Sequence, residues 1–585
     1  MSTFDFDAIV IGSGFGGSVM TYRLAEAGMR VCLLERGKAH PPGSFPRSPW
    51  RMKTNFWDPS EGLQGMFNIW SFDNIGGVVS SGLGGGSLIY ANVLYRKPEE
   101  TFEREGWPIR YQDLERHYGD AERMLNGQSY PFQRRGEERS QARQPYNLTS
   151  KTMAMEIAAD ALKDTNPDLM FELPKLAVTF ANPGEEPRLA EPITGAPPSM
   201  FGRTRLTCQL CGECDLGCNY GSKNTLDLTY LSAALQLPLP PDIRARSEVR
   251  EFEPYDGGYR VRYVVHQDGP VGRKRSVASK DMPLTEITSR YLILSAGSFG
   301  STFLMLKNAD NFPHLSRKAL GTRFCGNGDL LTFLYRSQEE DEKALRPRVL
   351  DPSYGPVITS AIRFHEKDAN GQSRGYYYVE DAGYPEFTNW LIEATDLYSL
   401  FKRLTRIARA MVPRWLRRRA GADTDISQEI GALLGDCTLS SSSMPLLSMG
   451  RDTPDGVMSL NEKGRLAVDW SIQTSAPYFA NVRRSGAQIA KALHARFHDN
   501  PLTHLSRVIT VHPLGGCPMG ASPDEGVVDT NGEVFGHPGF FIADGSVIPG
   551  PVGPNPSLTI AACAGKFADH LISQWKASIH PKSLQ

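Results

Sequence analysis

The sequence of 585 residues has no excess of charge of either sign, few cysteines and no long apolar run. Its 64 Lys and Arg residues nearly cancel 65 Asp and Glu residues, and the net charge of −1 provides no overall basic field for nucleic acid. Nine cysteines are too few for a disulfide scaffold. The uncharged stretches are too short to span a bilayer, and the first residues do not resemble a secretory signal. We expect a cytoplasmic globular chain of about four domain-sized units with no nucleic-acid partner.

Glycine, in contrast, is abundant, with 56 residues, and the first glycines lie within a strand–helix–strand pattern. Residues 5–12 predict a buried parallel strand. A Gly-rich turn follows, then a helical pattern that runs through Ala27 and stops at Gly28, and then a second strand over Val31–Leu34. This order of elements is typical of an α/β nucleotide-binding fold.

The turn after the first predicted strand has the spacing GxGxxG. Gly12 allows the tight turn, Gly14 lets backbone amides approach a pyrophosphate, and Gly17 lets the helix pack closely on the strand. Glu35 ends the second strand, where a carboxylate accepts hydrogen bonds from ribose hydroxyls. These residues predict a dinucleotide site, and the same fingerprint serves both NAD and FAD.

Two later segments offer further contacts for an extended cofactor. A second Gly-rich loop presents bare backbone at four consecutive positions, Gly84, Gly85, Gly86 and Ser87. Near the end of the chain, a predicted strand ends at Asp544 and Gly545. Asn555 and Pro556 then open a predicted helix, whose N-terminus favours the negative charge of a reduced flavin.

Together these segments resemble the glucose–methanol–choline (GMC) flavin oxidoreductases, and in particular their cholesterol-oxidase-like branch. The resemblance covers nearly the whole chain and depends on several long motifs that occur in family order. The motifs are GSGFGGS (12–18), GGGS (84–87), Trp107-Pro108, LSAGSFGST (294–302), HPLGGC (512–517) and FIADGSVIPGPVGPNPSLTI (541–560). The resemblance implies bound FAD and the oxidation of an alcohol by hydride transfer to N5 of the flavin.

The wide separation of the Gly-rich segments predicts one nucleotide domain assembled from several pieces. We expect residues 1–99, 241–330 and 505–577 to form a Rossmann-like FAD-binding domain of the GMC type. Residues 100–240 and 331–504 are expected to form an inserted α+β substrate-binding domain, in which a sheet with helices roofs the flavin. The predicted fold class is therefore α/β with an α+β substrate domain.

The resemblance also assigns two contacts to FAD. It implies that Val249 meets the adenine through its backbone. In the second Gly-rich loop, sterol oxidases carry Asn where this chain has Tyr90, and Asn92 stands two residues further on. We therefore expect Asn92 to be the cofactor-binding residue of this loop.

Oxidation of an alcohol requires the removal of a hydroxyl proton and of a carbinol hydride. A histidine that titrates near neutral pH is a natural proton acceptor, and His512, beside Pro513 and a Gly pair, is the strongest candidate among the twelve histidines. Asn555 can donate a hydrogen bond to the developing alkoxide or orient the hydroxyl. On the residues alone, His512 could equally be structural. By resemblance, His512 and Asn555 match the catalytic His–Asn pair of the family.

Sterol oxidases also isomerise a double bond with a buried carboxylate. Glu380 lies where that acid would fall, and burial among Tyr376, Tyr377, Tyr378 and Val379 would raise its pKa and suit it to shuttle a proton. The alternative is an acid at a strand end that pairs with a base or with solvent. Glu380 is therefore a candidate catalytic residue for an isomerase activity.

Four cysteines, Cys208, Cys211, Cys214 and Cys218, fall within eleven residues. Their spacing is that of bacterial ferredoxins, except that Asn219 replaces the final Pro, and it suits an iron–sulfur cluster, ligated by three or four thiolates, or zinc. Some GMC dehydrogenases resemble this chain in carrying a cluster on a cysteine-rich loop. The alternative is a set of thiols, or a disulfide, that packs the loop. A cluster would pass electrons singly to a carrier and make the enzyme a dehydrogenase.

Residues 396–420 hold eight Lys and Arg residues against one acid, with apolar residues at helical spacing. A basic amphipathic helix of this kind predicts peripheral contact with a membrane or with an acidic electron carrier. The alternative is a helix buried by its apolar side, with its basic face in solvent.

These features predict an FAD-dependent enzyme that oxidises an alcohol to a ketone or aldehyde. We expect a sterol-like, long-chain or aromatic alcohol as substrate, and O2, a quinone or an electron-carrier protein as acceptor. Three alternatives stay open: a cluster-bearing dehydrogenase of a polar alcohol, a non-redox lyase with a spectator flavin, and an electron-transfer flavoprotein without a small substrate.

Overall fold

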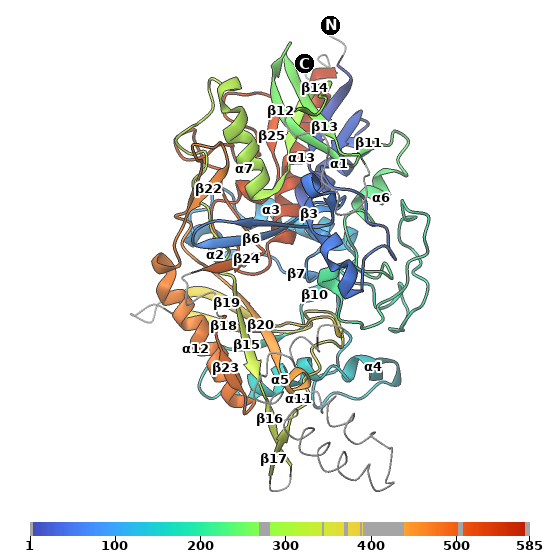
Figure 1. Cartoon of the computed structure of the whole chain (residues 1–585), viewed down its shortest axis with the longest axis vertical. Coiled ribbons are helices and arrows are strands. Elements are labelled where there is room, and N and C mark those ends of the chain that lie inside the picture. The colour runs from blue at the N-terminus through green and yellow to red at the C-terminus, as the bar shows by residue number, and fades with distance from the viewer. Residues whose placement is uncertain are drawn as a thin grey trace, which may run out of the picture.

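The first apolar segments of the chain form the centre of a seven-stranded sheet, in the upper half of Figure 1. The computed structural model describes residues 4–267, 281–341, 344–367, 373–386, 389, 438–500 and 507–579. Strand β1 (Phe6–Ile11) pairs in parallel with β2 (Val31–Leu34) on one side and with β14 (Thr285–Leu294) on the other. Strand β11 (Asp242–Arg244) extends the sheet beyond β2, and β25 (Phe540–Ile542) pairs in parallel with the end of β14.

The other half of this sheet is antiparallel. Strands β12 (Ser247–Tyr255) and β13 (Gly258–Val265) form a hairpin, and β13 pairs with the first half of β14. The two residues of the turn, Asp256 and Gly257, have φ angles of 49° and 78°, which match a tight two-residue hairpin turn. The parallel strands therefore end at the Gly-rich turns, while the hairpin covers the neighbouring edge.

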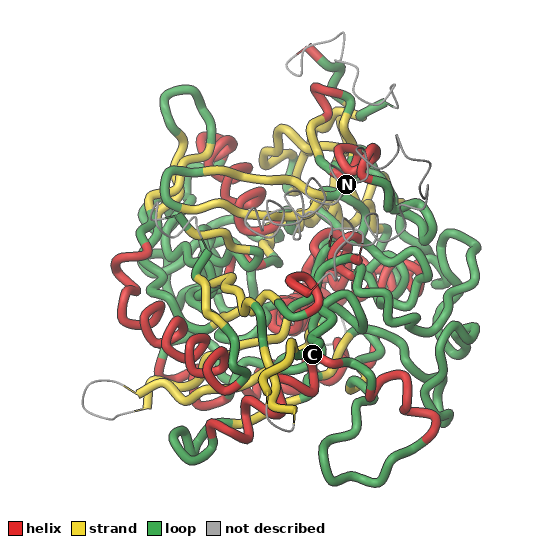
Figure 2. The backbone as a smooth tube through the Cα atoms, turned by 60° about the horizontal axis from the view of Figure 1, so that its bottom comes forward, coloured by secondary structure: helices red, strands yellow, loops and turns green. Residues whose placement is uncertain are grey.

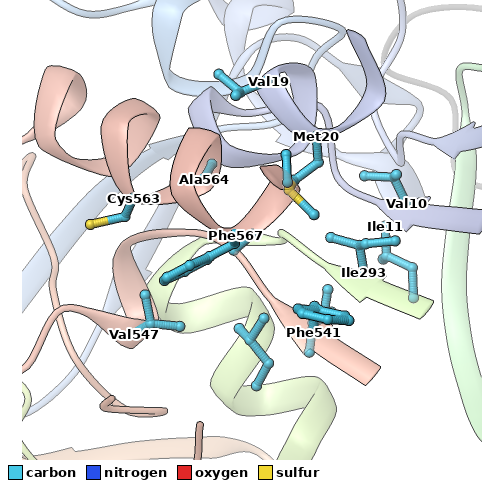
Figure 3. Close-up of a cluster of buried hydrophobic side chains, with 14 of the residues drawn as sticks. Val10, Ile11, Val19, Met20, Ile293, Phe541, Val547, Cys563, Ala564 and Phe567 are labelled. Carbon is cyan, nitrogen blue, oxygen red and sulfur yellow. The ribbon is translucent and has the colours of Figure 1, made fainter. Parts of the chain in front are cut away.

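Three helices far apart in the sequence pack together on this sheet. Helix α1 (Phe15–Glu26) packs on α13 (Ser557–Ile579), and α13 packs on α3 (Tyr111–Met124). Side chains from β1, α1, β14, β25 and α13 form one buried cluster, which includes Met20 and Phe567 (Figure 3). Each large apolar side chain buried in this way stabilises the fold by about 1.5–3 kcal/mol.

A second, six-stranded antiparallel sheet lies in the lower half of Figure 1. In sheet order its strands are β23 (Arg496–His498), β15 (Leu330–Tyr335), β20 (Met444–Met449), β19 (Ser373–Asp381), β18 (Ala361–Lys367) and β9 (Met170–Glu172). Helices α5 (Ser150–Leu162) and α12 (Ala476–Ala492) share a buried core with it. Burial alternates along β15, so Leu330 and Leu334 face that core while Leu331 and Phe333 face the opposite side.

A small sheet lies between the two large ones (Figure 1). Strand β6 (Ile75–Ser80) pairs with β5 (Phe67–Ser71) and, in parallel, with β24 (Val508–Thr510). Because His512 follows β24 by two residues, this sheet brings the predicted catalytic residue between the two large sheets.

The remaining elements are short, and long loops connect them (green in Figure 2). They are strands β3 (Trp57–Asp58), β4 (Leu63–Gln64), β7 (Val93–Leu94), β8 (Gln128–Ser129), β10 (Lys175–Leu176), β16 (Gln338–Asp341), β17 (Ala344–Pro347), β21 (Val457–Leu460) and β22 (Leu466–Asp469), and helices α2 (Glu99–Arg104), α4 (Gln144–Asn147), α6 (Tyr230–Ala234), α7 (Gly297–Asn308) and α11 (Thr438–Ser441). Across the described ranges, no helix combines the length and apolar character that a membrane span requires.

The structure has the first strand, the first helix and the second strand where the sequence predicts them. One difference concerns the predicted start of the substrate domain at residue 100. Phe102 and Leu114 belong to the core of the first sheet, because α3 packs on α13. The basic segment 396–420 lies outside the described residues, so its membrane contact stays a prediction.

Candidate active site

A cavity of about 1320 Å³ lies between the two large sheets, and both contribute to its wall. We call the part lined by Gly14, Gly86 and Val249 the glycine-rich end. The part lined by Leu331 and Leu447, from β15 and β20, is called the apolar end.

The glycine-rich end is a cradle in which two loops touch. A Cβ atom on Gly12, whose φ is 97°, would lie 2.3 Å from the carbonyl oxygen of Ser295. A Cβ atom on Gly85 would lie 2.5 Å from the Cα of Gly14. On Gly14 or Gly86, in contrast, it would meet nothing within 4 Å, although both residues line the cavity. Packing within the protein does not explain these last two glycines, and the space beside them fits the pyrophosphate of a dinucleotide.

Glu35 lines the cavity at the end of β2, as the fingerprint predicts. One carboxylate oxygen accepts hydrogen bonds from the Ser13 backbone N–H (3.1 Å) and hydroxyl (2.6 Å), and the other accepts one from the Gly37 N–H (2.8 Å). Burial raises the pKa of Glu35, and these hydrogen bonds act against that shift. The carboxylate thus braces the first Gly-rich turn, and its contact with ribose stays a prediction.

Three other predicted cofactor residues support the loops from behind the wall. A Cβ atom on Gly17 would lie 1.9 Å from the carbonyl oxygen of Gly12, which reflects the close packing of α1 on β1. The Ser87 hydroxyl donates to the Gly84 carbonyl (2.7 Å) and accepts from the Leu226 N–H (2.9 Å). These residues shape the cradle, and none of them belongs to its lining.

Asn92 is fully buried and has a positive φ of 71°. Within the described part of the chain, neither its amide nitrogen nor its amide oxygen has a hydrogen-bond partner. A buried amide without partners costs about 1–3 kcal/mol. Asn92 does not line the cavity, although its neighbours Ala91 and Val93 do, so its contact with the flavin stays a prediction.

The other predicted cofactor contacts surround the same cavity. Val249 lines it on β12, where the pairing with β13 shifts register. Gly545 and Pro556 line it beside the start of α13. Asp544 also lines it, but its carboxylate accepts hydrogen bonds from the Gly297 and Ser546 backbone N–H groups, both at 2.8 Å. Asp544 therefore ties the start of α7 to the loop after β25.

His512 lines the cavity, and its position is set by a carboxylate that the sequence analysis missed. The distance from Nδ1 of His512 to Oδ1 of Asp329 is 2.8 Å. Oδ2 of Asp329 accepts hydrogen bonds from the Thr510 hydroxyl (2.9 Å) and from the backbone N–H of Val511 (2.8 Å) and His512 (3.2 Å). Asp329 lies 183 residues from His512 and belongs to none of the motifs. The sequence therefore indicated only that a carboxylate stands just before β15.

This arrangement assigns the tautomer of His512. The Thr510 and backbone groups around Asp329 all donate, as expected for a carboxylate, which can only accept. Nδ1 of His512 must therefore carry the hydrogen, which leaves the lone pair of a neutral imidazole on Nε2. His512 is thus set up as a proton acceptor.

Asn555 lines the cavity just before α13, and its amide oxygen has no hydrogen-bond partner among the described residues. Glu380 interacts with it from behind the wall, although neither oxygen of Glu380 completes a hydrogen bond. Burial holds the pKa of Glu380 well above its ordinary value, and the charge of Asp381 raises it further. The side chain of Asn555 acts against this shift. Glu380 does not line the cavity, so its isomerase role stays a prediction.

The four clustered cysteines line a separate small cavity as free thiols. Burial raises the pKa of Cys208 and Cys214, and raises that of Cys211 to about 12, which favours neutral thiols over the thiolates that bind metals. In the portion of the chain that the structure describes, no three His, Cys, Asp or Glu side chains are placed to hold a metal ion. The structure therefore gives no support to the predicted iron–sulfur or zinc site.

The apolar end continues from β15 and β20 into the loops around them. Its lining side chains are mainly Leu331, Phe333, Val357, Ile358, Pro445, Leu447 and Val511. Tyr384 adds a ring whose hydroxyl donates to the Ser440 carbonyl (3.1 Å). An apolar molecule could be buried here next to the His512 imidazole.

A cradle for a dinucleotide, an oriented histidine and an apolar pocket define a cofactor-dependent oxidoreductase. Comparisons with known proteins identify the family. The family described as GMC oxidoreductase matches residues 452–564, and the NAD(P)-binding Rossmann-like domain matches residues 10–44. The chain belongs to the GMC oxidoreductase family, and it is an FAD-dependent enzyme that acts on the CH–OH group of an alcohol.

Its relatives include cholesterol oxidases and a plant oxidase. The cholesterol oxidase of Mycobacterium tuberculosis is 28% identical over 96% of this chain and 90% of its own length, and that of Acinetobacter baumannii is 26% identical over 98% and 95%. A long-chain-alcohol oxidase of Arabidopsis thaliana is 22% identical over 97% of this chain and 68% of its own.

Solved structures show the same fold at lower identity. A fungal aryl-alcohol oxidase has a TM-score of 0.55 at 14% identity, with 98% of this chain and all of the other (100%) covered. Pyridoxine 4-oxidase from Mesorbium loti has a TM-score of 0.51 at 15% identity, with 96% and 98% covered. The mixed α/β GMC fold, with its Rossmann-like FAD-binding sheet and antiparallel second sheet, agrees with the predicted fold class.

Proposed function

We propose that this enzyme oxidises a largely apolar alcohol, sterol-like or long-chain, to the ketone or aldehyde. The observation that carries the proposal is the apolar end of the cavity, whose wall of β15 and β20 side chains adjoins His512. A sugar bound there would lose water from its many hydroxyls, and the mainly apolar side chains of this wall would give most of them no partner. The similarity to cholesterol and long-chain-alcohol oxidases supports the same substrate class.

The residues of the site divide the reaction between them. FAD, which the cradle around Gly14 and Gly86 fits, supplies the acceptor for the hydride that leaves the carbinol carbon. Nε2 of His512 accepts the hydroxyl proton, and Asp329 stabilises the imidazolium that forms. The amide of Asn555 donates to the carbinol oxygen as negative charge develops on it. The apolar wall excludes water from these groups.

The test is an anaerobic titration of the purified enzyme with alcohols, followed by the absorbance of its flavin. Sterols and long-chain alcohols are expected to reduce the flavin and so lower its absorbance. Glucose at the same concentration is expected to leave the absorbance unchanged. Air is then admitted and hydrogen peroxide is measured. If hydrogen peroxide forms and the absorbance of oxidised flavin returns rapidly, O2 is the electron acceptor. If the absorbance returns slowly, another carrier is the acceptor.

His512→Gln is expected to slow flavin reduction by about 10²- to 10⁴-fold with FAD still bound. The matched control is His314→Gln, because His314 is exposed and outside the cavity lining. Reduction by glucose alone, or an unchanged rate in His512→Gln, would refute the proposal.

A further inference from the structure

Asp215 places a carboxylate in the wall of the cavity at its apolar end. It lies in the cysteine-rich loop, in the short helical turn Cys214–Leu216. Val357, another wall residue of this end, donates its backbone N–H to Cys214, the neighbour of Asp215. Within the described residues, the Asp215 side chain makes no hydrogen bond and no ion pair. Asp215 is half-buried, so its carboxylate is open towards the cavity and can accept a hydrogen bond there.

The backbone on both sides of Asp215 is fixed. Lys223 donates to the carbonyl of Cys214 (2.8 Å), the residue before it. Arg47 donates to the carbonyls of Leu216 (3.1 Å) and Gly217 (2.5 Å), the residues after it. The carboxylate is therefore held towards the cavity by bonds that do not involve the carboxylate itself.

The two ammonium groups near Asp215 already use all their N–H donors in other hydrogen bonds. Lys223 donates to the carbonyls of Leu88 (3.0 Å), Tyr90 (2.7 Å) and Cys214 (2.8 Å). Lys151 donates to the carbonyls of Pro356 and Val357, both at 2.8 Å, and to Asp381 (2.9 Å). An ammonium has three donors, so both groups are saturated.

The charges around Asp215 also indicate what kind of donor would suit it. Asp381 balances Lys151, and Arg205 acts on Asp227. Lys223 forms no ion pair within the described residues, so its charge balances that of Asp215 without a bond. A cationic ligand would leave this pocket with a net positive charge. A neutral hydroxyl would supply the missing hydrogen bond and leave the charge unchanged.

Asp215, His512 and Asn555 all line the same cavity. Lys223 and Lys151 are the charges that act on Asp215, and Lys151 also pairs with Asp381, whose charge acts on Glu380 beside Asn555. The other lining residues of the apolar end are mainly apolar. A single substrate could therefore contact His512 with one hydroxyl and Asp215 with another.

We propose that Asp215 determines specificity by accepting a hydrogen bond from a second hydroxyl of the substrate. The preferred substrate is then an apolar diol, one hydroxyl of which reaches His512 while the other reaches Asp215. This inference depends on the proposed function, because it names the substrate class of the same site.

The experiment measures kcat/KM by flavin reduction for matched pairs of alcohols. One set pairs n-alkan-1-ols with α,ω-diols of the same chain length, over a series of chain lengths. A second set pairs a 3β-hydroxysteroid with the steroid that carries a further hydroxyl at the far end of the ring system. The wild-type enzyme is expected to prefer the diol by about tenfold or more at one chain length, or in the steroid pair.

Asp215→Leu is expected to bring that ratio to about one, because the acceptor is lost. Asp215→Asn, which keeps an acceptor oxygen, should retain part of it. The control is Asp310→Leu, at an exposed aspartate outside the cavity lining, which should leave the ratio unchanged. FAD content and binding of each alcohol, followed as a perturbation of the flavin spectrum, show that each variant is folded.

The outcomes separate the two proposals. If no apolar alcohol reduces the flavin, the proposed function fails and this inference with it. If apolar alcohols reduce it without preference for the diol, or if Asp215→Leu keeps the preference, only the role of Asp215 is overturned. A shifted flavin potential in Asp215→Leu, with the ratio unchanged, would place Asp215 against the cofactor and also overturn it.

Discussion

The two ends of the cavity are built from different parts of the chain. At the glycine-rich end, Gly14 and Gly86 present bare backbone, and the carboxylate of Glu35 is hydrogen-bonded to the loop itself. At the apolar end the wall consists of side chains, and its carboxylates differ in state. Asp329 is bonded to His512, whereas Asp215 has no partner within the described residues.

This difference shows how each end obtains its specificity. Backbone amides and helix N-termini recognise phosphate in any chain that keeps the turn, so a short local motif is enough. Side chains from distant strands discriminate between alcohols, and they depend on how the second sheet packs. We therefore expect substitutions at the glycine-rich end to abolish cofactor binding, and those at the apolar end to change rates and preferences.

The largest expected effect is the loss of FAD, and it distinguishes Gly14 from Gly12 in the same turn. Gly14→Leu should give a folded protein without FAD, because Gly14 has an ordinary φ of −69° and its new side chain would enter the cradle. Gly12→Ala should fail to fold, because its Cβ would lie 2.3 Å from a backbone oxygen at a φ of 97°. Circular dichroism and the flavin-to-protein absorbance ratio measure both. FAD bound by Gly14→Leu at wild-type level would show that the cradle is not the cofactor site.

The next effect concerns the pairing of Asp329 with His512. Asp329→Asn should slow flavin reduction by about 10²-fold or more, because an amide group facing Nδ1 and the Val511 N–H cannot hold the same tautomer. Stopped-flow reduction with a saturating apolar alcohol at one pH measures it. Asp351→Asn, outside the cavity lining, is the control. An unchanged rate would remove Asp329 from the mechanism.

A smaller effect follows from the titration of Asp215. Burial raises the pKa of Asp215 to about 6, and the nearby charges of Lys223 and Lys151 act against that shift. The carboxylate is therefore present above this pH, and it is protonated and a weaker acceptor below it. The diol preference should fall several-fold (about threefold or more) between pH 7.5 and 5. In Asp215→Asn the preference for the diol should not vary with pH. If it falls with pH in this variant as it does in the wild type, another group is responsible for the titration.

The smallest effect is on stability and concerns Glu380. As the pH rises through the ordinary carboxyl pKa, the unfolded chain releases the proton that folded Glu380 retains, so wild-type stability falls from there upward. Glu380→Gln has no proton to release. Its melting temperature should exceed that of the wild type by about one degree or more at pH 8, and by less near pH 4.5. A difference independent of pH would mean that Glu380 is ionised in the folded enzyme.

Much of the glycine-rich end could be predicted from the sequence, because its chemistry is local. The turn containing Gly12 and Gly14 carries its own backbone geometry, and Asn555 directly precedes the helix that begins at Ser557. The motifs also singled out His512, which lines the cavity. The burial of Glu380 could be predicted from its neighbours in the sequence. Its position behind Asn555 could not.

The apolar end could not be predicted in the same way. Asp329 meets His512 only because β15 and β24 are brought together across 183 residues of sequence. Asp215 sits among cysteines whose spacing suggested a metal, and no periodicity indicates that its side chain faces the cavity. Such contacts are set by tertiary packing, which leaves no local pattern.

Lys223 connects regions that would otherwise be treated as separate modules. One ammonium holds the carbonyls of Leu88 and Tyr90, which follow the second Gly-rich loop, and that of Cys214 in the cysteine-rich loop. A protein engineer who transplants either loop into a relative must therefore transfer the lysine and the other loop as well. The two loops and Lys223 therefore have to be treated as one structural unit.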